Sequence, residues 1–183
     1  CSLAQSDKLK IVYLDIFSCR SDRDFYDAFA SAILKQTSSK LDEWLEHAKL
    51  FLSRISPKIS MGTDPMTDFS ISLEINPKSN NIDEILQLPE KIAQKKGCNI
   101  VVCIDEFQQI AEYPEKGAEA LLRSYIQFVP NINFIFAGSK QHIMQQMFHS
   151  AKRPFYQSTQ TQVIDRIARD EYYRFAADFF TRQ

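Results

Sequence analysis

Two adjacent carboxylates follow an apolar run near the middle of the chain. Residues 99–104 are almost all apolar, and Asp105 and Glu106 come directly after them. In open α/β sheets, ligands bind at the carboxyl ends of the strands, which is where these two side chains would lie. A first carboxylate there can hold Mg²⁺, usually through water, and a second can orient or deprotonate a water molecule that attacks a phosphate. The pattern alone is a modest signal of phosphate chemistry that depends on magnesium. A plain alternative is that an acidic residue here only caps the next helix.

Polar side chains also lie near the ends of two other predicted strands. Ser139 follows the apolar run 132–137, where a small hydroxyl side chain could sense a phosphate or the attacking water. The same residue could instead be a helix N-cap, which is a common role for serine. Asp15 lies in the strand at residues 10–17. Together with Asp105 and Glu106 it could hold a metal ion, as in a metal-dependent nuclease or phosphohydrolase.

The elements that position these residues follow from the spacing of the apolar residues. We expect strands at 10–17, 99–104 and 132–137, a weak strand at 162–167, and a β-hairpin within 57–77. We expect helices at 22–36, 39–56, 115–128 and 170–180, a helix that ends at 148, and one helix or two short ones at 81–96, where Pro89 would begin a new turn. Strands that alternate with helices predict an α/β domain whose mostly parallel sheet has helices on both faces.

Length and composition allow one packed domain and point to no special compartment. The 183 residues are 44% hydrophobic and include 14 phenylalanines, so a packed core is expected. The net charge of −1 gives no electrostatic reason to expect nucleic-acid binding, which stays open. The four cysteines form no metal-binding or CxxC pattern, and His47, His142 and His149 have no catalytic partners in the sequence. No apolar run reaches the roughly 18 residues of a membrane helix, so we expect a cytoplasmic protein without membrane contacts.

Three segments in combination resemble a known family. These are IVVCIDEFQQI at 100–110, FIFAGS at 134–139 and RPFY at 153–156. They are similar to the archaeal-type ATPases, which are AAA+-related P-loop NTPases of the STAND group, and the resemblance extends from about residue 10 to about residue 180. It identifies the carboxylate pair as a Walker B motif. It implies Asp105 as the residue that binds magnesium, Glu106 as the catalytic carboxylate, Ser139 in the sensor position, and ATP as the nucleotide.

The sequence departs from this family in the part that holds phosphates. No G-x-x-x-x-G-K-[ST] loop is present, and the chain starts without a methionine shortly before a predicted strand. We therefore expect residues 1–183 to be a partial P-loop ATPase core, with an insertion at about 39–77, that is inactive alone. No arginine follows the RPFY loop closely, so Arg153 and Arg166 are only candidates for an arginine finger.

The family's sheet order is 5-1-4-3-2, so the absent phosphate-binding strand would leave the strand at 132–137 as an exposed edge. We expect either a misplaced or poorly formed last strand or another chain that fills the gap, with a protein partner or a second copy as the candidates for binding at that edge. The alternative function is a non-enzymatic α/β interaction module in which the Walker B carboxylates are vestigial.

Overall fold

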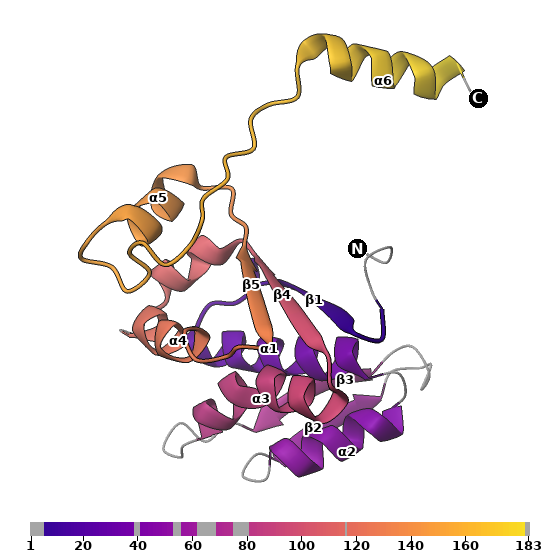
Figure 1. The fold of residues 1–183 in the computed structure, drawn as a ribbon, viewed down its shortest axis with the longest axis vertical. Helices are drawn as coiled ribbons and strands as arrows, with labels where there is room; N and C mark the ends of the chain where they lie inside the picture. The colour runs from indigo at the N-terminus through magenta and orange to yellow at the C-terminus, as the bar shows by residue number, and fades with distance from the viewer. Residues whose placement is uncertain are drawn as a thin grey trace.

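The computed structural model describes residues 6–38, 41–52, 56–61, 69–74, 81–115 and 117–181 (Figure 1). The strands are β1 (Leu9–Asp15), β2 (Ser56–Met61), β3 (Phe69–Glu74), β4 (Asn99–Asp105) and β5 (Ile132–Phe136). The α-helices are α1 (Asp22–Thr37), α2 (Leu41–Phe51), α3 (Asn81–Lys96), α4 (Ala118–Ile126), α5 (Gln141–His149) and α6 (Arg169–Thr181). A 3-10 helix, η2 (Phe107–Glu112), follows β4.

Three of these strands form a parallel sheet in the order β1-β4-β5. In the register, Val12 pairs with Val102 and Val102 pairs with Phe134. The expected α/β class, a parallel sheet flanked by helices, is confirmed. The central strand is β4, so the two carboxylates at its end lie in the middle of the sheet's carboxyl edge.

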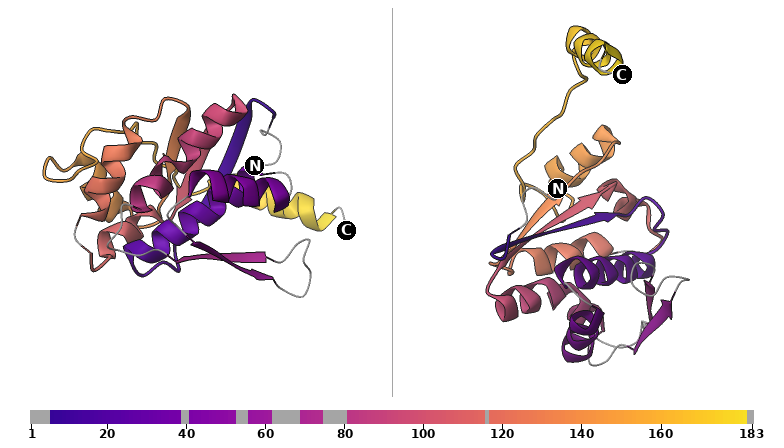
Figure 2. Two further views of the ribbon diagram at one scale, coloured as in Figure 1. Left: turned by 90° about the horizontal axis from the view of Figure 1, so that it is seen from below. Right: turned by 90° about the vertical axis from the view of Figure 1, so that its right-hand side faces the viewer.

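The two faces of the sheet differ in burial, because successive side chains of a strand point to opposite faces. Val12, Ile100, Val102 and Ile104 are fully buried on the face against which α1 and α3 pack (Figure 2). On the opposite face Tyr13 and Ile135 are 46% and 53% exposed, and Val101 and Cys103 are partly exposed. We call these four residues, Tyr13, Val101, Cys103 and Ile135, the open face. In the described part of the chain the helices thus cover one face of the sheet, whereas the sequence predicted cover on both.

Helix α1 forms where the sequence predicts it. The Ser21 side chain accepts a hydrogen bond from the backbone N–H of Asp24 and so caps the first turn. Phe25, Phe29 and Ile33 repeat at helical spacing and are buried against the sheet. This helix anchors one side of the core.

Helix α3 runs without a break from Asn81 to Lys96, with Pro89 inside it. The alternative of two short helices is therefore wrong. Proline removes one hydrogen bond to the carbonyl four residues before it, here that of Ile85. Burial of Ile85, Leu88 and Ile92, each with 0% exposure, holds the helix together across this gap.

The segment after β4 differs most from expectation. The helix predicted at 115–128 is shorter, because Gly117 with a φ of +109° precedes α4, and η2 was not predicted. Residues 162–167 form no strand, and Ile164 is 90% exposed. The weak strand expected at these residues is therefore wrong. Strands β2 and β3 pair antiparallel as the predicted hairpin does, and its turn at 62–68 lies outside the described residues.

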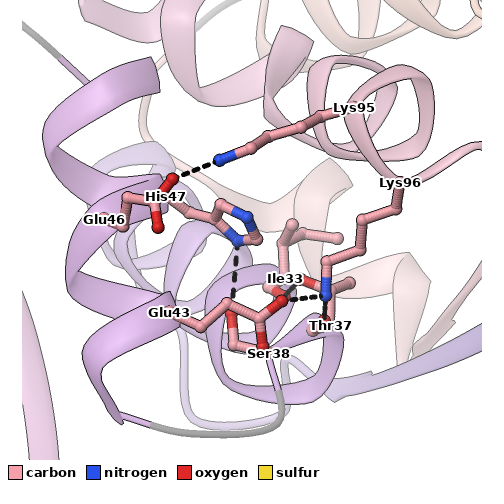
Figure 3. Close-up of polar contacts among 8 residues, drawn as sticks. All are labelled: Ile33, Thr37, Ser38, Glu43, Glu46, His47, Lys95 and Lys96. Atoms are coloured by element: carbon pink, nitrogen blue, oxygen red, sulfur yellow. Dashed lines mark hydrogen bonds and ion pairs between the residues drawn. The ribbon is translucent and has the colours of Figure 1, made fainter.

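Charged residues attach α2 to the core (Figure 3). Lys95 Nζ lies 2.6 Å from Glu46 Oε1, and Lys96 Nζ lies 2.6 Å from Glu43 Oε1 and also donates to the carbonyl of Thr37 at the end of α1. The last turn of α3 thereby joins the ends of α1 and α2. Cations in a last turn also interact favourably with the negative end of the helix dipole.

His47 lies beneath these ion pairs and is 2% exposed. Its Nδ1 lies 3.3 Å from the hydroxyl oxygen of Ser38 (Figure 3). Burial and the nearby Lys95 and Lys96 lower the pKa of His47 from 6.5, while Glu43 and Glu46 act in the opposite direction. The folded chain therefore favours the neutral imidazole.

We expect His47 to contribute a loss of stability as the pH drops below about 6.5, because the unfolded chain then binds a proton at position 47 that the folded chain resists. His47→Gln removes this proton uptake and should flatten the pH dependence of the free energy of unfolding between about pH 6.5 and 5. Urea denaturation at several pH values measures it. The matched control is His142→Gln, since His142 is exposed. Equal effects of the two substitutions would contradict this assignment.

Candidate functional site

Asp105 ends β4 with both carboxylate oxygens hydrogen-bonded. Its Oδ1 accepts the backbone N–H of Glu106 at 2.9 Å, and its Oδ2 accepts the hydroxyl of Tyr13 at 2.7 Å. Tyr13 lies on the neighbouring strand β1, on the open face. The parallel pairing of β1 with β4 therefore places Tyr13 where it can hold Asp105.

Glu106 adopts an unusual backbone conformation. Its φ of +55° and ψ of +35° lie in the left-handed region, which is unfavourable for a residue with a Cβ atom. Such conformations concentrate at functional sites, where the surroundings enforce them. Here the neighbours on each side are fixed: the N–H of Phe107 donates to the carbonyl of Ala137, and the N–H of Ala137 donates to the carbonyl of Ile104.

A cluster of four phenylalanines enforces this turn. The Phe107 ring is fully buried, and its centroid lies 4.2 Å from that of Phe136, 5.4 Å from that of Phe155 and 5.9 Å from that of Phe148. Aromatic pairs at these distances each contribute about 0.5–1.5 kcal/mol beyond the burial of their area. Because Phe107 must enter this cluster directly after the strand, Glu106 makes the reversal and its side chain faces the other way.

The Glu106 carboxylate joins two strand ends. Its Oε2 accepts a hydrogen bond from the hydroxyl of Ser139 at 3.0 Å and a second, short one from the amide nitrogen of Gln108. Ser139 follows β5, so the structure brings Asp105, Glu106 and Ser139 together at the carboxyl edge. The helix-cap alternative for Ser139 is not realised, since Lys140 precedes α5 at the cap position.

Gln108 is a site residue to which the sequence analysis assigned no role. Its side chain is fully buried, and its Oε1 atom has no hydrogen-bond partner among the described residues. A Cβ atom at Gly138 would lie 2.3 Å from this oxygen and 2.8 Å from the sulfur of Met144. Gly138 therefore leaves the space through which Gln108 reaches Glu106. The only sequence signal was the glycine before Ser139.

Tyr13 is the second residue that sequence reasoning missed, because it reads as an ordinary strand residue. The hydrogen bond to Asp105, then partial burial and the negative charges of Asp105, Asp15 and Glu106, raise the pKa of Tyr13 to about 12. The nearby carboxylates of Asp15, Asp105 and Glu106 make this edge suited to a cation or a hydrogen-bond donor.

The donor set fits a magnesium ion that is bound mainly by other ligands. Carboxylate and hydroxyl oxygens are the ligands that Mg²⁺ prefers, but no group of three or more metal-ligating side chains occurs within the described ranges. Mg²⁺ is usually bound by one or two carboxylates together with water and phosphate oxygens. Asp15 pairs with Asp105 in register, and its Oδ1 accepts the N–H of Phe17 at 2.8 Å. The nuclease alternative, which needs Asp15 as a further metal ligand, gains no support from this geometry.

The two arginines named as finger candidates have different surroundings. Arg153 donates to Glu119, a buried carboxyl whose pKa is raised by burial against the opposing effect of Arg153. Arg166 is exposed in the segment between α5 and α6. The structure therefore gives Arg153 a role in holding the loop at 153–156 against α4.

The contact between Gly138 and Gln108 generates a prediction. Gly138→Ala should lower the free energy of unfolding by about 1–3 kcal/mol, because the added methyl group displaces the Gln108 side chain in a packed interior. Gln108→Ala removes most of this overlap. The losses of unfolding free energy in the two single variants should therefore add up to more than the loss in the double variant. Urea denaturation of the four proteins measures the coupling. Strictly additive losses would show that the two residues do not meet.

Comparison with known proteins finds likenesses only among solved structures. No family model matches the chain, and no curated protein matches it. The Walker-type ATPase PABY2304 of Pyrococcus abyssi superposes with a TM-score of 0.47 at 16% identity, over 80% of this chain and 39% of that one. The ORC2 protein of Aeropyrum pernix, in ADPNP and ADP complexes, superposes with a TM-score of 0.46 at 15% identity, over 82% of this chain and 31% of that one. The chain thus spans less than two fifths of the length of either structure.

Proposed function

We propose that this chain is the hydrolytic part of an ATP-dependent switch domain of the archaeal-type ATPase kind. The observation that carries the proposal is the Glu106 carboxylate, held by Ser139 and Gln108 at the mouth of the central strand beside Asp105. Open α/β sheets bind ligands at the carboxyl ends of their strands, which is where both carboxylates lie. Strained residues such as Glu106 also concentrate at functional sites.

Each residue takes a separate role in this proposal. Asp105 would hold Mg²⁺ through water, and the ion would neutralise charge on the β and γ phosphates of ATP. Glu106 would accept the proton of the attacking water at Oε1, because both described donors bind Oε2. Ser139 would keep the carboxylate oriented and respond to the γ-phosphate. When the ion binds, Tyr13 would either keep or give up its hydrogen bond to Asp105.

The phosphate cradle must come from elsewhere in this proposal. The 183 residues contain no G-x-x-x-x-G-K-[ST] sequence, whose backbone amides and lysine would hold the phosphates. We therefore propose that another segment or another chain supplies it next to the edge strand β5. By itself the 183-residue chain should not bind ATP tightly.

A second candidate is a non-enzymatic interaction module. It is favoured by the two hydrogen bonds that already occupy both oxygens of Asp105, and by the exposed apolar residues of the open face. In that case Asp105 and Glu106 would have a structural role at the end of β4. Nucleotide binding by a protein that combines this chain with a phosphate-binding loop separates the two candidates.

The catalytic role predicts a specific loss. In the protein that carries this chain together with its phosphate-binding loop, Glu106→Gln should lower kcat for ATP hydrolysis by roughly 10²–10⁴-fold while ATP binding is retained, because the amide cannot accept a proton. Steady-state phosphate release and a nucleotide titration measure the two quantities.

The matched control is Glu112→Gln. Glu112 lies on η2 in a half-exposed ion pair with Lys140, at 2.7 Å, so its removal tests a nearby carboxylate outside the site. This variant should hydrolyse ATP at nearly the unchanged rate. Normal turnover by Glu106→Gln would refute the catalytic role, and absence of ATP binding by the unsubstituted protein would favour the interaction module.

A further inference from the structure

Helix α6 carries a wide apolar surface that no described residue covers. Tyr172, Phe175, Ala176 and Phe179 recur at the spacing of one helix face, and Tyr173 and Phe180 border them. These five aromatic side chains are 54–75% exposed, and α6 has no buried residue. In Figures 1 and 2 the helix stands apart from the sheet and its helices. Within the described part of the chain, no helix is long and apolar enough to span a membrane.

The chain has a second, partly exposed apolar surface of similar length. The open face presents Tyr13, Val101, Cys103 and Ile135 from three adjacent strands. These strands have five to seven residues and are therefore roughly 17–23 Å long. A helix of 13 residues such as α6 is about 20 Å long. The helix can thus cover the length of the face.

The connection between the two surfaces begins at the right place. The Ser158 hydroxyl donates to the carbonyl of Phe155, whose ring packs against Phe136 at the end of β5. The segment from there to α6, residues 158–168, is exposed from Thr159 onward, has eleven residues and can span up to about 36 Å. Because α6 is tethered next to the sheet, its effective concentration at the open face is of the order of millimolar or higher.

Charge complementarity sets the direction of the helix. Arg169 at the start of α6 lies on the same face as Tyr172 and Ala176, since the three are spaced by three and four residues. A helix that begins near the carboxyl edge, where the tether starts, brings Arg169 and the positive end of the helix dipole toward Asp15 and Asp105. The remaining charged residues, Asp170, Glu171, Arg174 and Asp178, then face solvent.

We infer that α6 docks in the same chain onto the open face of the sheet, antiparallel to the strands, with its aromatic face inward. This helix then supplies the cover that the second face of the sheet lacks. The inference rests on the two uncovered apolar surfaces and the tether, and it does not depend on the proposed function.

Cys103 in the middle of the open face reports the docking. If α6 covers it, modification of the Cys103 thiol by iodoacetamide should be slow, and Phe175→Ser with Phe179→Ser should accelerate it at least tenfold. The matched control pair is Arg174→Ser with Asp178→Ser on the polar face, which should change the rate less than twofold. Peptide mass spectrometry separates Cys103 from the other cysteines. An unchanged rate in the Phe175 and Phe179 variant overturns the inference and leaves α6 to another partner.

Two further readouts identify the occupant. The slow modification rate should be the same over a hundredfold range of protein concentration, whereas docking of α6 from a second copy would slow it as concentration rises, which would overturn the assignment to the same chain. In addition, Ala176→Cys should form a disulfide with Cys103 within one chain under oxidation by copper phenanthroline, and Arg174→Cys should form at least tenfold less. Equal yields, or a disulfide only between chains, would contradict the docking.

Discussion

Burial of Phe107 is the constraint from which the geometry of the candidate site follows. Its ring fills the space between Phe136, Phe148 and Phe155, and so it ties together the end of β5, helix α5 and the loop after α5. Since Phe107 comes two residues after Asp105, the last residue of β4, the chain has no room for a gradual turn, and Glu106 takes the left-handed conformation. The energy of packing four aromatic rings offsets the strain of one residue, which is typically about 1–3 kcal/mol. The core therefore fixes the backbone of Glu106, and the hydrogen bonds from Ser139 and Gln108 fix its side chain.

The aromatic cluster sets the backbone at Glu106, and polar contacts set the orientation of its side chain. Ser139 and Gln108 both donate to one carboxylate oxygen, so they fix the rotation of the side chain and leave the other oxygen facing away from these two donors. Gln108 can reach the carboxylate only because residue 138 has no side chain. The Oε1 atom of Gln108 has no partner among the described residues, and a buried amide oxygen left unpaired is costly. The site thus combines a strained backbone, a shared carboxylate and an incompletely paired amide.

The sheet has an asymmetry that links the site to the far end of the chain. One face is covered by α1 and α3, and the ion pairs of Lys95 and Lys96 add α2 to that layer. The other face carries Tyr13, which binds Asp105, among apolar residues that the described body leaves exposed. A helix docked there would lie directly over the Tyr13 and Asp105 contact. A helix docked on this face would then influence Asp105 through the hydrogen bond that Tyr13 donates to it.

The sequence by itself determined the parallel α/β class, the three strands of the sheet, the capped helix α1 and the carboxyl edge where Asp105, Glu106 and Ser139 meet. These features follow from local patterns: apolar runs, a serine three residues before an acidic residue, and polar residues at strand ends. Only the tertiary structure decided that Glu106 is strained, that Gln108 and Tyr13 belong to the site, and that α3 passes through Pro89 unbroken. Each of these depends on packing between segments far apart in the chain, such as Phe107 against Phe155 or Tyr13 beside Asp105. Hydrophobic periodicity reports which residues are buried, but it does not report which distant residues bury them.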